Sequence, residues 1–375
     1  MRIADLASGV VERHVRSRQR GCQTRRYHPI IGPGACPMST RTLPTLDDVA
    51  RLAGVSTATV SRCVNLPDRV RQSTKNRVEA AIAELGYTPH FGGMALASNR
   101  TNTIGAVIPT MDNAIFARGV QVLQEELSLV GITLLVASSL YDPEKEARQI
   151  RALLGRGVDG LILIGRERPQ ETYRLLADRQ IPFVLMWTYS DDLTYSQVGF
   201  DNHRAAYDMT QHVISRGHSR IAMIAGTTAG NDRARERVEG VSHAMRNHGL
   251  LLAPPMLIET HYSVEHGKLA AQQFLALDER PTAIICGNDV QAAGALKAAH
   301  QAGLRVPQDM SIVGFDDIDL AEAVEPGLTT VHVPHRRMGR EAAHLIMRMV
   351  RNEQPVESIR IATSIVERAS LADIS

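Results

Sequence analysis

The feature that most constrains the fold is an alternation of short apolar runs with amphipathic stretches, which begins near Thr103 and continues almost to the C-terminus. Continuously apolar runs separated by helices are typical of parallel β-sheets that are covered by helices on both faces. Expected helices include residues 144–154, 205–215 and 290–302. The expected strands lie at residues 104–109, 134–137, 160–164, 183–187, 198–200, 221–225, 283–286, 312–315 and 329–333.

These runs fit one sheet of nine or more strands or two lobes of about five strands each. Two lobes are the better interpretation, because ligands of such proteins bind where the carboxyl ends of strands face a crevice. The 375 residues are enough for two or three domains, at roughly 100–200 residues per domain. No apolar run approaches the ~18–20 residues of a membrane span, so no membrane segment is expected.

The net charge of +2 is unevenly distributed along the chain. Residues 1–38 hold seven Arg against Asp5 and Glu12, a net charge of +5, and residues 39–98 carry +2. The rest of the chain therefore carries −5. A basic front and an acidic body indicate a nucleic-acid contact at the front, although ordinary surface charge also produces a bias of this size.

The first 38 residues combine clustered Arg with Pro and Gly, and they lack the apolar run of a secretory signal. We predict that this basic extension is disordered. One hypothesis is that translation begins at Met38, and the alternative is a genuine basic arm that adds non-specific phosphate contacts.

Neither a cofactor nor a metal site is expected, and we predict that the chain is not an enzyme. No Walker loop, G-x-S-x-G elbow or H-E-x-x-H motif occurs, and the pair His332 and His335 lacks further zinc ligands at suitable spacing. Residues 155–160 satisfy G-x-G-x-x-G, but they follow an expected helix and open an expected strand, the reverse of the dinucleotide-binding order. The cysteines form no C-x-x-C pair, which fits a reducing cytoplasm; they are Cys22, Cys36, Cys63 and Cys286.

Residues 45–65 predict two short helices joined by a tight turn. Thr45 is a suitable N-cap, and Asp48 follows three residues later as in a capping box. Gly54 can end the first helix in the left-handed conformation, and Ser56 can cap the second. Two helices joined in this way form a helix-turn-helix, or else an ordinary helical hairpin.

The second helix of a helix-turn-helix lies in the major groove, with its first residues against base edges. Thr57 and Ala58 can offer methyl groups to thymine, and Arg62 is the usual bidentate partner of guanine. Thr59 and Ser61 are better suited to phosphate contacts, which position the helix without reading sequence.

A third helix is expected from its cap Ser73 to Leu85, followed by Gly86-Tyr-Thr-Pro and then Ala-Leu-Ala at residues 95–97. Together with the run D-V-A-x-x-A-G-V-S-x-x-T-V-S-R and Asn65, this order of motifs resembles the headpiece of the lactose-repressor (LacI) family. The resemblance implies a helix-turn-helix DNA-binding domain over residues 39–89, in which Asn65 takes part.

The same resemblance implies a hinge helix over residues 90–101. It also implies that Leu96, paired with its twin from a second subunit, inserts into the minor groove of the operator. Such an apolar wedge unstacks a base step and kinks the duplex. Because Gly92 and Gly93 are poor helix formers, we expect the hinge to be poorly formed without DNA. This fits a hinge that orders on binding, and the alternative is a weaker grip on the operator.

The resemblance continues through the body, which it predicts to be a two-lobed domain like the periplasmic binding proteins, with parallel sheets, over residues 102–370. The family pattern implies three crossings between the lobes, near residues 200–202, 331–334 and 360–363. It also implies a homodimer that binds a palindromic DNA operator under the control of a small-molecule effector. The matching motifs are Gly157-Val-Asp-Gly160, Arg216-Gly-His218, Gly287-Asn-Asp289, Arg305-Val-Pro307 and Gly314-Phe-Asp-Asp317.

By the same resemblance, effector-binding residues lie at strand ends that face the cleft. A polyol needs paired donors and acceptors with an aromatic face, and an Arg can clamp a carboxylate. The expected residues are Asp112, Asn113, Phe116, Trp187, Arg237, Asp289 and Asp316, with Tyr262 and Asp201 as weaker candidates.

Each of these residues also has a purely structural interpretation. Trp187 can belong to the core, and Arg237 can form a structural ion pair with Asp289. Asp112, Asp316 or Asp317 can cap the helix that follows it.

Residues 108–113, 165–168 and 198–202 are most similar to gluconate-type members of the family. We therefore expect a sugar or sugar-acid effector such as gluconate. The competing class is a solute-binding receptor that shares only the body fold, which would need an export signal and no headpiece.

Overall fold

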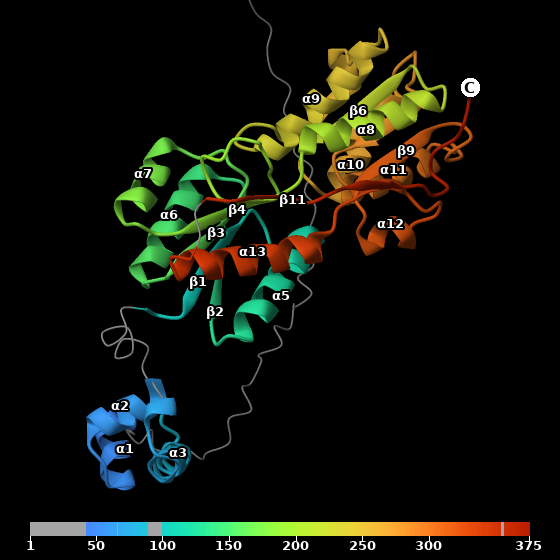
Figure 1. Cartoon of the computed structure of the whole chain (residues 1–375). Helices are drawn as coiled ribbons and strands as arrows, with labels where there is room; N and C mark the ends of the chain where they lie inside the picture. The colour runs from blue at the N-terminus through green and yellow to red at the C-terminus, as the bar shows by residue number, and fades with distance from the viewer. Residues whose placement is uncertain (1–42, 66, 89–99, 354–355) are drawn as a thin grey trace, which may run out of the picture. The chain divides into compact units, whose positions relative to one another are not determined.

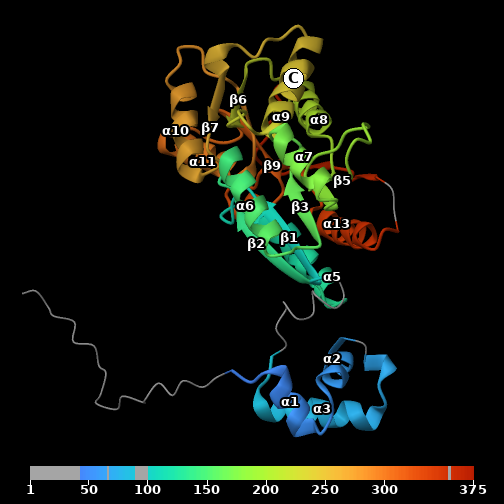
Figure 2. The same ribbon diagram turned by 90° about the vertical axis from the view of Figure 1, so that its left-hand side faces the viewer.

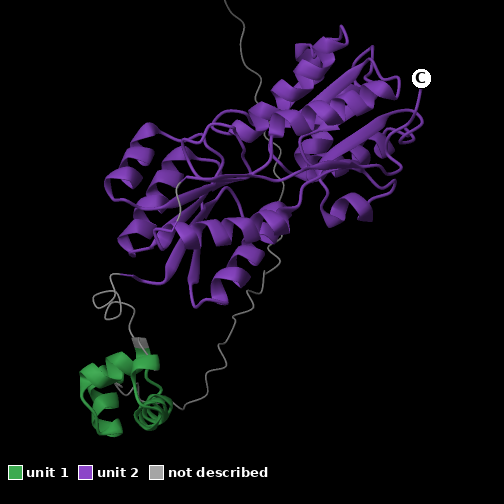
Figure 3. Cartoon of the chain, viewed as in Figure 1, with its two compact units in different colours: residues 1–88 green, residues 89–375 purple. Residues whose placement is uncertain are grey.

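The computed structural model describes residues 43–65, 67–88, 100–353 and 356–375 (Figure 1). The chain divides into two compact units, residues 1–88 and 89–375 (Figure 3). The predictions for the basic extension, for the hinge and for Leu96 lie outside the described residues.

The first unit is a three-helix domain with a small core of its own. The Thr45 side chain and Asp48 form the expected capping box, and Gly54 ends the first helix with φ 63°. The prediction that Ser73 caps the third helix is wrong, because that helix already begins at Gln72, after Arg71, without a side-chain cap. Its elements are α1 (Leu46–Ala53), α2 (Thr57–Asn65), η1 (Pro67–Arg69) and α3 (Gln72–Leu85). The core is formed by Val49, Ala50, Ala53, Val60, Cys63, Val78, Ala81 and Tyr87.

The second unit contains two separate sheets, which we call lobe 1 and lobe 2 (Figures 1 and 2). The lobe 1 sheet has the order β11-β5-β4-β3-β1-β2 and is parallel throughout. Its strands are β1 (Thr103–Ile108), β2 (Thr133–Ser138), β3 (Gly160–Ile164), β4 (Phe183–Met186), β5 (Gln197–Gly199) and β11 (Ser358–Arg360).

The lobe 2 sheet has the order β12-β10-β9-β8-β6-β7, and only its edge strand β12 pairs antiparallel. Its strands are β6 (Ile221–Gly226), β7 (Leu257–Thr260), β8 (Ala283–Cys286), β9 (Ser311–Asp316), β10 (Thr329–His332) and β12 (Ser364–Val366). The two-lobed α/β fold with parallel sheets is thus confirmed, with six strands in each sheet instead of about five.

Helices cover both faces of each sheet, because successive strand residues point to opposite faces. In β3, Ile162 and Ile164 pack toward α5 and α13, whereas Leu161 and Leu163 pack toward α6 and α7 (Figures 1 and 2). The lobe 1 helices are α5 (Ala114–Ser128), α6 (Pro143–Gly155), α7 (Gln170–Asp178) and α13 (His335–Val350). The lobe 2 helices are α8 (Asn202–Ser215), α9 (Asp232–Asn247), α10 (Val264–Leu275), α11 (Asp289–Gln301) and α12 (Asp319–Ala323), with a short η2 (Pro254–Met256).

The chain passes between the lobes at three places that match the predicted crossings. These are the links from β5 to α8, from β10 to α13 and from β11 to β12. As expected, the G-x-G-x-x-G segment follows α6 and opens β3. Within the described parts of the chain, no helix is long and apolar enough to cross a membrane.

Candidate functional site

The first candidate site is the outer face of α2 in the three-helix unit. Val60 is fully buried and Cys63 nearly so, which fixes the inward face of this helix. Ala58 and Arg62 are exposed on the other side. Thr57 and Ser61 are half-buried beside them. The residues predicted to read DNA therefore share the solvent side of one helix.

The turn that holds α2 in place is built as the sequence predicts. Ser56 accepts a hydrogen bond from the Thr59 backbone N–H at 3.2 Å, so it caps the helix. The Thr59 hydroxyl lies 2.9 Å from Ser56 Oγ, so this side chain also takes part in the turn. Asn65 is the last residue of α2.

The second candidate site is a small cavity in the two-lobed unit, with about 20 Å³ accessible to the centre of a water molecule. That is room for about one water molecule, far below the roughly 300–1,000 Å³ of small-molecule sites, so an effector can enter only when the residues around the cavity move apart. Residues of both lobes line the cavity: Asn113, Ile115, Phe116, Tyr141 and Trp187 from lobe 1, and Asn231, Arg233, Arg237, Tyr262, Asn288 and Asp316 from lobe 2.

Most of the predicted effector residues line this cavity. Asn113, Phe116, Trp187, Arg237 and Asp316 do so, and so does the weaker candidate Tyr262. Asp112, Asp289 and Asp201 do not.

The three predicted residues that are absent from the cavity wall lie elsewhere in the fold. Asp289 is fully buried and accepts hydrogen bonds from Thr330 Oγ1 at 2.6 Å and from the Ile318 backbone at 2.9 Å. Asp201 caps α8 through the Arg204 backbone. Asp112 is exposed, and the cap of α5 is its neighbour Asn113, so the interpretation of Asp112 as that cap is wrong.

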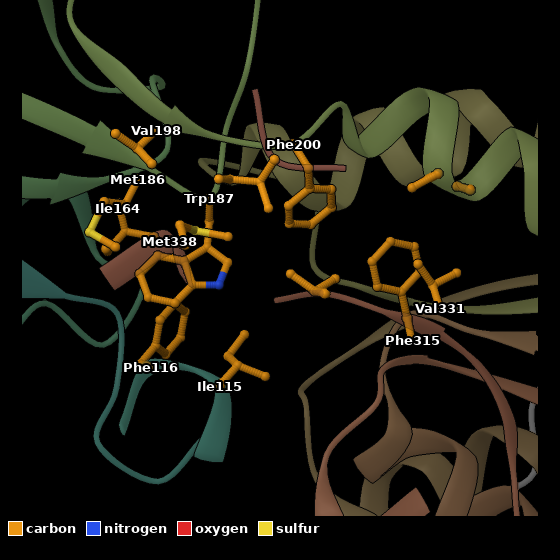
Figure 4. Packing of buried hydrophobic residues seen from close by; sticks show 14 of the residues in the cluster. Ile115, Phe116, Ile164, Met186, Trp187, Val198, Phe200, Phe315, Val331 and Met338 are labelled. Carbon is orange, nitrogen blue, oxygen red and sulfur yellow. The ribbon is translucent and has the colours of Figure 1, made fainter. Parts of the chain in front are cut away.

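One wall of the cavity is aromatic. The rings of Phe116 and Trp187 meet edge to face, with centroids 5.2 Å apart, and Figure 4 shows them side by side. Trp187 is 1% exposed and belongs to the core cluster as well as to the cavity wall. Its core and site interpretations are therefore compatible.

Arg237 is held rigidly at the base of the cavity. It donates to Asn202 Oδ1 at 2.9 Å and to the Gly287 carbonyl at 2.6 Å. Its guanidinium lies 3.7 Å from the centroid of the Phe315 ring, a cation–π geometry. The nearest carboxylate is Asp316, at 3.6 Å, so the predicted ion pair with Asp289 is wrong.

Asp316 is the one carboxyl group in the cavity wall among the described residues. It is 1% exposed, and its Oδ1 has no hydrogen-bond partner in the part of the chain that the structure describes. Burial raises its pKa to about 7, although Arg237 opposes that rise. It does not cap α12, and neither does Asp317, because that helix begins after Ile318 without a side-chain cap.

Three lining residues have backbones in the left-handed region, which is costly for a residue with a side chain. The φ angles are 59° at Tyr141, 59° at Trp187 and 105° at Asp316. Such outliers gather at ligand sites, where the surrounding structure holds them in place.

Sequence reasoning missed Ile115, Tyr141, Asn231, Arg233 and Asn288. Asn231 and Asn288 are N-caps of α9 and α11, as Asn113 is of α5. A search for Asn directly before an expected helix would have found them. Tyr141 lies in the loop before α6, where no local pattern marks it.

Arg233 connects the cavity to a contact between the lobes. It donates to Asp232 Oδ1 at 2.9 Å, and the other oxygen of Asp232 accepts the Arg166 backbone N–H of lobe 1 at 2.7 Å. Nearby, Arg235 donates to Glu167 at 2.8 Å, again across the lobes. Among the residues that the structure describes, no group of three or more His, Cys, Asp or Glu side chains could hold a metal ion.

Comparison with known proteins finds two family models that match the chain. The family model for bacterial regulatory proteins of the lacI family matches residues 45–90. A model for the periplasmic binding protein-like domain matches residues 210–371.

Two curated relatives are similar over most of the chain. The HTH-type transcriptional repressor PurR of Photobacterium profundum is 33% identical over 336 residues, which cover 89% of this chain and 100% of PurR. The repressor CytR of Escherichia coli K12 is 35% identical over 306 residues, which cover 82% of this chain and 89% of CytR. Both are transcriptional repressors, and regulators of this kind are not enzymes.

A crystal structure of the lac repressor dimer bound to operator and the anti-inducer ONPF has a TM-score of 0.78 at 27% identity. It covers 88% of this chain and 99% of that one. The chain belongs to the LacI family of bacterial transcriptional regulators.

Proposed function

We propose that this regulator is a homodimeric repressor whose operator affinity is set by a small sugar acid, with gluconate as the first candidate. The family accounts for a DNA-binding region and an effector-binding domain. The proposal adds the chemical class of the effector and the residues that hold it.

The observation that carries the proposal is the excess of donors around the cavity. Asn113, Asn231 and Asn288 use their side-chain oxygens to cap α5, α9 and α11. The group that each can still offer to a ligand is therefore its amide NH₂, of which that of Asn231 already donates to the Thr227 carbonyl at 3.2 Å. A ligand rich in acceptors, above all a carboxylate, matches such a wall.

The electrostatics of the same wall favour an anion. The N-termini of three helices meet at the cavity, and a helix N-terminus carries a partial positive charge. Arg233 and Arg237 add two guanidinium groups to the wall, although Arg233 is paired with Asp232 at 2.9 Å and Arg237 lies 3.6 Å from Asp316. Phe116 and Trp187 offer an apolar face to the C–H side of a sugar.

Calorimetry of the full chain against D-gluconate, D-glucuronate, D-glucose, cellobiose and adenine tests the effector class. We expect binding of a sugar acid and weaker or no binding of the neutral sugars. Binding of only a neutral sugar or the nucleobase would contradict the proposal.

A matched pair of variants tests the donor argument. Asn288→Asp keeps the oxygen that accepts the Gln291 backbone N–H at 2.9 Å but replaces the amide donor by a negative charge. We expect gluconate binding to weaken about 10- to 100-fold. The control is Asn247→Asp on the exposed end of α9, outside the cavity.

For DNA reading, we propose that α2 of each subunit contacts base edges through Thr57, Ala58 and Arg62. Thr59, Ser61 and Asn65 support these contacts. We further propose boundaries of 39–89 for the headpiece, 90–101 for a hinge that carries Leu96, and 102–370 for the body, and we place the protein in the cytoplasm with its operator. A gel shift tests the DNA-reading proposal, with DNA from upstream of the protein's own gene as the probe and genomic DNA as the competitor. Equal binding to the two DNAs would contradict sequence-specific reading.

A further inference from the structure

A buried histidine links the two lobes behind the effector cavity. His335 is the first residue of α13, directly after the crossing from β10. It is 3% exposed and does not line the cavity. Its Nδ1 lies 3.2 Å from Trp187 Nε1, and its Nε2 lies 3.3 Å from the carbonyl oxygen of Asp316.

These two partners fix the protonation of the ring. An indole N–H is only a donor, so Nδ1 must accept from Trp187. A carbonyl oxygen is only an acceptor, so Nε2 must carry the hydrogen that it donates to Asp316. The neutral Nε2–H tautomer is the one form that satisfies both, and burial lowers the pKa of His335 to about 3, which keeps the ring neutral.

The two partners belong to different lobes and to the cavity itself. Trp187 follows β4 in lobe 1, Asp316 ends β9 in lobe 2, and both side chains line the effector site. Trp187 and Asp316 have positive backbone φ angles of 59° and 105°. Such backbone conformations are strained and persist only where the surrounding structure holds them in place.

The indole is also confined by α5, at a point where this helix lies close to the His335 backbone as well. A Cβ atom placed on Gly119 of α5 would lie 2.6 Å from Cη2 of Trp187, so the ring rests directly against this helix. A ligand that shifts the indole must therefore move α5 or change the hydrogen bond to His335. Close-packed interiors respond to such a shift by switching between arrangements instead of deforming smoothly.

We propose that His335 is a positioning residue that couples the effector site to operator affinity, through its hydrogen bonds to Trp187 of lobe 1 and to the Asp316 backbone of lobe 2. The inference rests on the proposed effector function of this cavity. Coupling between two binding sites is reciprocal. Operator DNA must therefore change the affinity of the cavity for the effector by the same factor by which the effector changes operator affinity.

The first experiment needs no effector. Trp187 is the single Trp of the chain, so its fluorescence reports this link directly. The probe is an operator duplex selected from a random library by the full-length protein. We expect the duplex to shift the Trp187 emission of the wild type and to leave that of His335→Leu unchanged, at saturating duplex in both cases.

Three further variants separate coupling from stability. In His335→Gln the amide can both accept and donate, so we expect the shift to return. In His335→Asn the side chain can still accept from Trp187 but is too short to reach Asp316, so we expect the shift to be lost. This variant tests the link to Asp316 in case His335→Leu does not fold. The control, His344→Leu, removes a His of the same helix whose Nε2 lies 3.3 Å from Glu126 of α5, within lobe 1.

The second experiment uses D-gluconate as the effector probe. The measured quantity is the ratio of operator affinity without effector to that with effector, which is about 5–150 in allosteric proteins. We expect this ratio to fall below about 2 in His335→Leu. The Kd of that variant for gluconate should change by less than about 3-fold. If gluconate has no effect on the wild type, the effector proposal fails and the DNA experiment still decides on His335. In the first experiment, the inference is overturned if the duplex does not shift the wild-type Trp187 emission, or if His335→Leu or His335→Asn shows the full shift. In the second, it is overturned if His335→Leu loses affinity for gluconate by as large a factor as it loses coupling.

Discussion

Arg62 lies on the exposed side of α2, directly before the buried Cys63. An exposed guanidinium at this place can form two hydrogen bonds with a guanine edge, and such a pair distinguishes one base from the others. We expect Arg62→Ala to weaken binding to the selected operator by about 1–3 kcal/mol and to relax specificity at one base pair. Fluorescence anisotropy on the operator and its single-base variants measures both effects.

The matched control for Arg62 is Arg246→Ala, which removes an exposed Arg from α9 of lobe 2. It should leave operator affinity unchanged. If Arg62→Ala weakened binding to random duplex as much as to operator, the side chain would be a phosphate contact, and the base-reading role would be wrong.

Asp316 gives a prediction about pH. Its folded-state pKa of about 7 lies above the usual value of 3.8 for an Asp side chain, so the folded protein binds the extra proton between these values. This contribution to stability is present at low pH and is lost as the pH rises through about 7, at up to about 1.4 kcal/mol per pH unit for one group. The destabilising effect of Asp316→Asn, measured by urea unfolding, should therefore shrink from pH 5 to pH 7.

The neighbouring Asp317 is the control for this prediction. Burial alone would raise its pKa, but hydrogen bonds from Arg368 and His332 lower it below the usual value. Asp317 therefore stays ionised from pH 5 to pH 7, so its own titration adds no pH dependence to the effect of Asp317→Asn across that range. A parallel pH dependence in the two variants would contradict the assignment.

Among single residues, the sequence predicts the side-chain types at the cavity better than their positions. Asp289 was expected there, but its neighbour Asn288 lines the cavity, while Asp289 turns inward to Thr330. At the start of a helix, adjacent side chains point in different directions, so a shift of one residue exchanges a ligand contact for a core contact. Which residue is the cap is decided by the path of the preceding loop, which no local pattern fixes.

At the scale of elements, the packing of α5 against α13 depends on two glycines. A Cβ on Gly339 would lie 2.2 Å from the backbone oxygen of Gly119, so the helices meet at backbone distance. We expect Gly339→Ala to force them apart and to lower the free energy of unfolding by about 1–3 kcal/mol. Gly155→Ala is the matched control in α6, because nothing lies within 4 Å of that position.

The control should behave in the opposite way, since Ala favours a helix over Gly by up to about 1 kcal/mol. Urea unfolding of both variants measures the two effects. Equal stabilisation by the two substitutions would show that the helices do not touch at Gly339.

The elements themselves were predictable where burial alone decides them. All nine expected strands occur, and β3 and β8 have the expected bounds. The strands β7, β11 and β12 were missed, because they are short edge strands with few buried side chains. Such strands are specified by pairing with a distant partner, as β11 is by β5, and not by their own pattern.

At the scale of the whole molecule, one subunit offers a single α2 helix to DNA, while its relatives include a repressor that is a dimer on its operator. A twofold dimer presents two such helices at a fixed separation and in opposite orientation, so it must read an inverted repeat. Once one headpiece is bound, the second binds at a high effective concentration, which adds a factor of roughly 10²–10⁴ to affinity.

We therefore expect that a duplex with one half-site scrambled binds the full-length protein at least about 100-fold more weakly than the intact inverted repeat. Five base pairs inserted at the centre should cost as much, because they rotate one half-site by about half a turn of the helix. Titration of the three duplexes at one salt concentration measures this, since phosphate contacts make every affinity salt-dependent. A scrambled half-site bound as tightly as the intact operator would mean that one headpiece is enough, and a subunit would then read DNA without its twofold partner.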